Sequence, residues 1–67
     1  MNKLDLHGIK HEDVDRLVEN FVLLNTPPLS IVTGNSQTMR SKVYDVCERH
    51  NVKCEQWTSG EIKILKW

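Results

Sequence analysis

The sequence predicts an α/β fold, a two-layer α+β sandwich of element order βαβαββ with a mixed sheet and both helices on one face. Three short segments alternate apolar and polar residues, as half-buried strands do, and a fourth is short and rich in β-branched residues. Two longer segments repeat apolar residues with the helical period of about 3.6 residues. The order of the segments implies two strand–helix–strand crossovers. Because such crossovers are right-handed, they place both helices on the same side of the sheet and leave the other face open.

The first strand is predicted over residues 3–7. Leu4 and Leu6 alternate with Asp5 and His7, so the leucines point towards the core and the polar side chains leave from the opposite face. A glycine then ends the alternation.

The first helix is predicted from Lys10, which takes the N-cap position and lets Ile9 pack against Val14. Its apolar residues form one stripe, made of Val14, Leu17, Val18, Phe21, Val22 and Leu24. The Pro27-Pro28 pair prevents the helix from continuing.

A second strand is predicted over residues 29–33, followed by a polar turn over residues 34–38 and a second helix. The stripe of this helix consists of Met39, Val43, Val46, Cys47 and His50. The residues suited to its N-cap are Asn35, Ser36 and Thr38. Asn51 suits a left-handed residue at its C-terminal end.

The last two strands are predicted over residues 52–57 and 61–66, as a hairpin with the three-residue loop Thr58-Ser59-Gly60. Pairing Trp57 with Glu61 gives a register in which the isoleucines lie on one face of the hairpin and opposite charges meet on the other. This register pairs Cys54 with Ile64, Gln56 with Ile62 and Glu55 with Lys63.

Composition indicates an ordinary globular chain. It has 67 residues, of which 39% are hydrophobic and 27% charged, and we expect a single stand-alone domain over residues 1–67. Nine basic and nine acidic residues cancel, so any nucleic-acid footprint must be local. The first residues lack the apolar segment of a signal peptide, and no apolar run approaches the roughly 18 residues of a membrane span. We therefore expect a cytoplasmic protein with no membrane partner, in which Cys47 and Cys54 are reduced and buried.

Two loops should carry the site, because ligands of open α/β sheets collect beyond the carboxyl ends of parallel strands. The candidate residues of the first loop are Asp5, His7 and Gly8, and those of the second are Thr33, Gly34, Asn35 and Ser36. Asp5 and His7 share a face, which suits general acid–base chemistry. The second loop precedes a helix, where amide groups and the helix dipole favour phosphate, with Arg40 and Lys42 supplying counter-charge.

Other interpretations of these residues stay open. Asp5 and His7 also fit a surface ion pair, and the second loop also fits an ordinary strand-to-helix turn. No cofactor is certain, but a divalent cation held by Asp5 and His7 with His11 or Asp13 is an alternative. The tryptophans Trp57 and Trp67 suit either base stacking or covering the sheet edge.

The order of LDLHG, an amphipathic helix, LSIVTG and a second helix resembles the small MutS-related (Smr) domain. That family's first motif, L-D-L-H-G, matches Leu4 to Gly8 in full. Its second, T-G-x-G or H-G-x-G, matches Thr33 to Asn35, with Ser36 in place of the last glycine. The resemblance covers nearly the whole chain, although the chain is shorter than most Smr domains.

The resemblance implies a fold like the C-terminal domain of bacterial translation initiation factor three. It also implies nucleic-acid binding, often with endonuclease activity, through RNA cleavage or DNA nicking. Asp5 and His7 map onto the motif residues implicated in cleavage, and residues 34–36 onto the loop thought to hold the backbone. Three hypotheses follow: an endonuclease that acts on RNA, a non-catalytic RNA- or ribosome-binding module that also uses Lys53 and Lys63, and a protein-interaction domain with an open sheet face.

Overall fold

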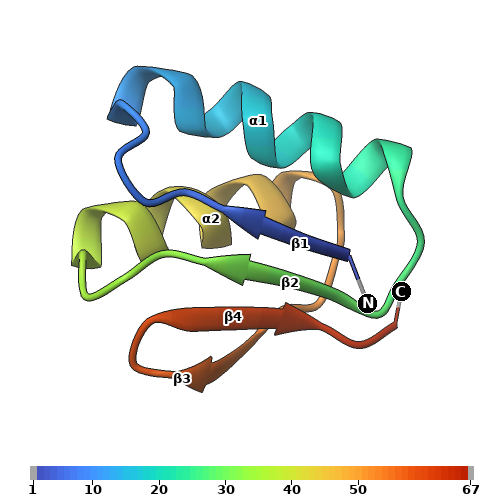
Figure 1. The fold of residues 1–67 in the computed structure, drawn as a ribbon. Coiled ribbons are helices and arrows are strands. Elements are labelled where there is room, and N and C mark those ends of the chain that lie inside the picture. Colours follow the sequence, from blue (N-terminus) through green and yellow to red (C-terminus); the bar gives the residue numbers. More distant parts are fainter. Residues whose placement is uncertain (1, 67) are drawn as a thin grey trace.

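The computed structural model describes residues 2–66. Its elements are β1 (Asn2–Asp5), α1 (His11–Leu24), β2 (Leu29–Val32), α2 (Gln37–Arg49), β3 (Glu55–Thr58) and β4 (Glu61–Ile64). The strands form one sheet in the order β1-β2-β4-β3, with β1 parallel to β2 and β4 antiparallel to both of its neighbours. Both helices cover one face of this sheet (Figure 1). The predicted α/β sandwich with a mixed sheet is therefore confirmed.

The core lies between the sheet and the two helices. Its buried apolar side chains are Leu6, Val14, Val18, Val22, Leu29, Ile31, Met39, Val43, Val46, Cys47, Ile62 and Ile64. Of the predicted stripe of α1, Val14, Val18 and Val22 are buried and Phe21 packs against the core, whereas Leu17 is only partly buried and the side chain of Leu24 is 80% exposed. Leu24 is the last residue of α1, and its position ten residues after Val14 rotates it to the margin of the stripe. No helix within residues 2–66 is long and apolar enough to cross a membrane.

The ends of α2 follow the predicted chemistry. Ser36 is the N-cap, and its Oγ accepts the backbone amide of Met39 at 3.1 Å. At the other end Asn51 has a φ of 57°, in the left-handed region. The amides of Asn51 and Val52 donate to the carbonyls of Glu48 and Cys47 at 3.1 and 2.8 Å. These two bonds form a Schellman motif, which turns the chain back towards the sheet.

Every strand differs from its predicted range at one end or both: residues 3–7, 29–33, 52–57 and 61–66 were predicted, and the strands are Asn2–Asp5, Leu29–Val32, Glu55–Thr58 and Glu61–Ile64. β1 ends at Asp5, although the amide of Leu6 still donates to the carbonyl of Val32 at 2.9 Å; the next amide, that of His7, donates to the carboxylate of Asp5 and closes a turn. In the hairpin, Thr58 rather than Trp57 pairs with Glu61, so Trp57 lies in a β-bulge and the loop has two residues.

The rest of the predicted hairpin register is partly confirmed. The pairs Glu55–Lys63 and Gln56–Ile62 are present, but β3 begins at Glu55, so Cys54 is not paired with Ile64. Trp57 is 52% exposed, and the Nζ of Lys63 lies 4.4 Å from the centroid of its ring.

Candidate nucleic-acid interface at the carboxyl ends of the parallel strands

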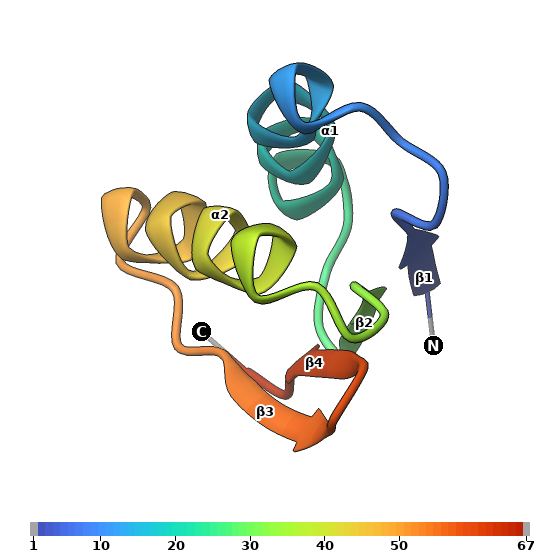
Figure 2. The same ribbon diagram turned by 90° about the vertical axis from the view of Figure 1, so that its left-hand side faces the viewer.

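Three segments that are distant in sequence meet at one end of the domain. They are the β1–α1 loop, the β2–α2 loop and the tip of the β3–β4 hairpin, and the first turns of both helices lie at the same end (Figures 1 and 2). A single carbonyl ties two of these segments together. The amides of Thr33 and Gly34 donate to the carbonyl of Gly60 at 2.8 and 3.1 Å. The predicted meeting of the two loops therefore includes a third partner, the hairpin tip.

Asp5 and His7 lie at the start of the first loop, and both are exposed. The Oδ1 of Asp5 accepts the backbone amide of His7 at 2.8 Å, which closes a short turn at the end of β1. Among residues 2–66, no side chain is hydrogen-bonded to the imidazole of His7. Asp5 thus fixes the main chain that carries His7, while a direct contact between the carboxylate and the imidazole stays a prediction.

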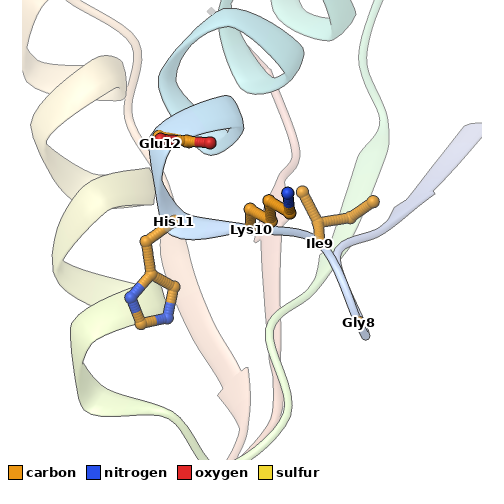
Figure 3. Close-up of a pocket in the computed structure, with 5 residues that line it drawn as sticks. All are labelled: Gly8, Ile9, Lys10, His11 and Glu12. Carbon is orange, nitrogen blue, oxygen red and sulfur yellow. The ribbon is translucent and has the colours of Figure 1, made fainter.

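Gly8 follows in the left-handed region, with a φ of 79°, which a glycine adopts without steric cost. The chain then enters α1 past a shallow, open hollow lined by Gly8, Ile9, Lys10, His11 and Glu12. The side chains of His11 and Ile9 point away from each other (Figure 3). The hollow is therefore an open surface and does not enclose a converging set of catalytic groups.

The second loop is built on close backbone packing. Gly34 has a φ of 65°, and a Cβ placed on Gly60 would lie 3.2 Å from the Cα of Gly34. Thr33 is 4% exposed, and its hydroxyl donates to the carbonyl of Gly34 at 3.0 Å. The amides of Thr33 and Gly34 are occupied by Gly60, so these two groups are not free to bind a phosphate.

Ser36 fits its place without strain. Its φ of −85° is an ordinary value for a residue with a side chain. Relative to the T-G-x-G motif, Ser36 therefore adds a helix cap and no distortion of the loop. The first amides of α2 have no partner within the helix, and the Ser36 hydroxyl takes up only that of Met39. The amides that remain for an anion are those at positions 35–38.

Arg40 has a structural contact that the sequence did not reveal. Its Nη1 donates to the carbonyls of Ser59 and Gly34 at 2.9 and 3.4 Å, which fastens the second loop to the hairpin tip. The guanidinium also lines a hollow with Asn35, Gln56 and Ser59. Arg40 therefore contributes positive charge beside the loop from a fixed position.

The remaining predicted groups are less closely connected. Lys42 lies within α2, and no hydrogen bond or ion pair joins it to the loops among residues 2–66. Nor does that part of the chain contain three His, Cys, Asp or Glu side chains grouped to hold a metal. The three-ligand site with His11 or Asp13 is thus not formed. Trp67 lies outside the described residues.

Sequence reasoning missed the contributions of Ser59 and Gly60. The hairpin loop was predicted, but its contact with the second loop depends on the order β1-β2-β4-β3, which places β4 directly beside β2. In the sequence, the contact is signalled only by Gly34 and Gly60, because backbones that pack closely favour glycine.

Comparison with protein-family models, with curated proteins and with solved structures gave no match. The functional argument therefore depends on the residues and their geometry.

Proposed function

We propose that this domain binds nucleic acid through the three-loop end, with RNA favoured over DNA, and that it acts there as an Smr-like endonuclease. The observation that carries the proposal is the meeting of two glycine-containing loops and two helix N-termini at the end of β1 that bears Asp5 and His7. Amides at a helix N-terminus and the helix dipole favour a phosphate.

The phosphate would occupy the amides at positions 35–38, beside the guanidinium of Arg40. The phosphate would not bind the amide of Gly34, as the sequence alone suggests, because the carbonyl of Gly60 already accepts that amide. Arg40 is held by two carbonyls and needs no reorganisation to contribute its charge. Lys10 adds a second exposed cation at the start of α1.

His7 would transfer a proton in the cleavage step. In RNA, a base removes the proton of a 2′-hydroxyl, whose oxygen then attacks the adjacent phosphorus, and an acid protonates the departing 5′-oxygen. One imidazole serves one of these roles at a time. His11 lines the hollow that begins at Gly8, so it is the nearest second imidazole along the loop. The direct role of Asp5 is to hold the turn that presents His7.

The deciding experiment incubates the protein with labelled RNA, with DNA of the same sequence and with RNA carrying one 2′-deoxy position, each with and without EDTA. We expect cleavage of RNA, none at the deoxy position, and at least a hundredfold loss in His7→Ala, the order of size of an acid–base contribution. His50→Gln is the matched control, because His50 contacts Glu19 on the side of the helices away from the loops. Cleavage by His7→Ala at the parental rate contradicts the catalytic role.

A non-catalytic binding module is the second candidate. It is favoured by the exposed imidazole of His7, which has no hydrogen-bonded side chain among residues 2–66. This candidate predicts RNA binding that weakens steeply with salt, without cleavage. Binding to the ribosome would follow the same rule. Affinity that is insensitive to salt would instead indicate a protein partner at the open face, around Trp57 and Lys63.

A further inference from the structure

The two cysteines form a pair at the end of the domain opposite the three loops. Cys47 lies on α2 and is 1% exposed. Cys54 lies just before β3, is partly exposed and packs against the core. Both are free thiols, as predicted, but only Cys47 is buried. The proposed function does not use either of them.

Two contacts on either side of the pair bring the thiols together. The Schellman turn returns the chain to Cys47, whose carbonyl accepts the amide of Val52 at 2.8 Å. On the other side, the hydroxyl of Tyr44 donates to the Oε1 of Gln56 at 3.0 Å. Tyr44 lies one helical turn before Cys47, and Gln56 lies two residues after Cys54, so each shares a face with its cysteine. Cys54 packs against the core cluster that contains Cys47, and each thiol is the main cause of the shift in the other's pKa.

The two thiols differ in character. The hydrogen bond from Cys47, aided by the backbone amide of Cys54, lowers the pKa of Cys54 against the opposing effect of burial. The same bond, together with burial, raises the pKa of Cys47. Cys54 is therefore the more acidic and the more exposed of the two thiols, which makes it the better nucleophile, while Cys47 holds its proton more strongly.

We propose that Cys54 is an oxidation site for hydrogen peroxide or an organic hydroperoxide, and that Cys47 resolves the product into an intramolecular disulfide. The Cys54 thiolate attacks one oxygen of the peroxide, the O–O bond breaks, and hydroxide leaves as the sulfur becomes a sulfenic acid. The Cys47 thiol then attacks that sulfur and loses its proton, and water departs. Two thiol groups are oxidised by two electrons in total, and one peroxide is reduced to water and hydroxide.

The disulfide would join the C-terminal end of α2 to the start of β3. It closes a short loop over residues 47–54, so it restricts the unfolded chain more than the native one. The resulting rise in Tm is expected to be about 5–15 °C.

The test treats the reduced protein with one equivalent of hydrogen peroxide, then unfolds and alkylates it for intact-mass analysis. We expect a monomer that has lost two hydrogen atoms and takes up no alkylating agent, with a linked peptide pair containing Cys47 and Cys54. Dithiothreitol should reverse both the mass change and the rise in Tm. In Cys54→Ser, Cys47 should stay unoxidised under the same treatment. Protein unfolded in urea should form the disulfide more slowly.

Two further measurements locate the first step. Dimedone, which traps sulfenic acids, should label Cys54 at early times in the natural protein and persistently in Cys47→Ala. Should Cys47→Ala fail to fold, the early label on the natural protein still identifies the attacking sulfur. The proposal is overturned by oxidation of Cys54 to sulfinic acid or to an intermolecular dimer without the internal bond. It is equally overturned if Cys54→Ser oxidises at Cys47 as fast as the natural protein does at Cys54.

Discussion

Substitutions at Ser36 separate the stability of α2 from the binding of phosphate. The hydroxyl of Ser36 caps the helix by accepting the amide of Met39 at 3.1 Å. Removing this cap in Ser36→Ala should cost about 1 kcal/mol of folding free energy, which lowers Tm by about 4–8 °C. Ser36→Gly should cost only a few tenths of a kcal/mol, and Ser36→Asp should cost little, because aspartate is also a good N-cap.

Affinity for RNA should follow a different order. Ser36→Asp places a carboxylate among the amides at positions 35–38. If it lies about 5 Å from a bound phosphate, the repulsion is roughly 1–3 kcal/mol for an effective dielectric constant between that of water and about 20. This corresponds to an affinity loss of about 5- to 150-fold at low salt, which moderate salt should reduce. Ser36→Gly should bind as tightly as the natural protein or more tightly, since it restores the T-G-x-G motif.

The assay is fluorescence anisotropy with a labelled RNA at low and moderate salt, paired with thermal unfolding of the same four proteins. Ser36→Asp should be stable but bind RNA weakly, and Ser36→Ala should be less stable but bind RNA tightly. The pair therefore separates helix capping from phosphate binding. If Ser36→Asp binds RNA as tightly as the natural protein at low salt, the second loop is not the phosphate site. The open face around Trp57 and Lys63 would then be the better candidate.

Three further predictions test the supports of the fold. Asn51 has a φ of 57°, so Asn51→Gly should leave stability unchanged or slightly higher, while Asn51→Val should lower the free energy of unfolding by about 1–2 kcal/mol in urea titration. In Gly60→Ala the new Cβ would lie 3.2 Å from Gly34, so chemical denaturation should show a loss of about 1 kcal/mol, and unchanged stability would mean that the hairpin tip moves freely. Folding lowers the pKa of Cys54, so this thiolate stabilises the native state above the pKa of the unfolded thiol, and the contribution disappears as the pH falls through the folded value. The pH dependence of iodoacetamide alkylation should therefore have its midpoint below that of the unfolded chain, and Cys47→Ala should move the midpoint upwards.

The sequence was sufficient for the features that depend on neighbouring residues. Most of the helical stripes, the Ser36 cap and the left-handed Asn51 follow from local spacing and side-chain chemistry, and these are present. The incorrect strand boundaries lie where a long-range contact or a main-chain hydrogen bond determines the structure. Trp57 enters a bulge because the hairpin pairs Thr58 with Glu61, and after β1 the chain turns at His7, whose amide donates to the carboxylate of Asp5.

The candidate site shows the same division between local and long-range information. Sequence placed the two loops at one end, since this follows from the order of strands and helices. It assigned Arg40 to the phosphate alone, because nothing local indicates that Ser59 and Gly34 would accept its Nη1. The occupied amide of Gly34 was equally hidden, because its acceptor lies in a hairpin 26 residues further along the chain, at Gly60.

This long-range contact has a consequence for binding. A loop that orders only when it meets a ligand reduces the affinity by the entropy it loses. Here the carbonyl of Gly60 and the guanidinium of Arg40 fix the second loop before any ligand arrives, so that entropy is already lost when the domain folds. The amides of Thr33 and Gly34 are used to build the loop, and no hydrogen bond within residues 2–66 occupies those at positions 35–38. If RNA binds at the second loop as proposed, substitutions at the hairpin tip should weaken that binding through the main chain of Gly34.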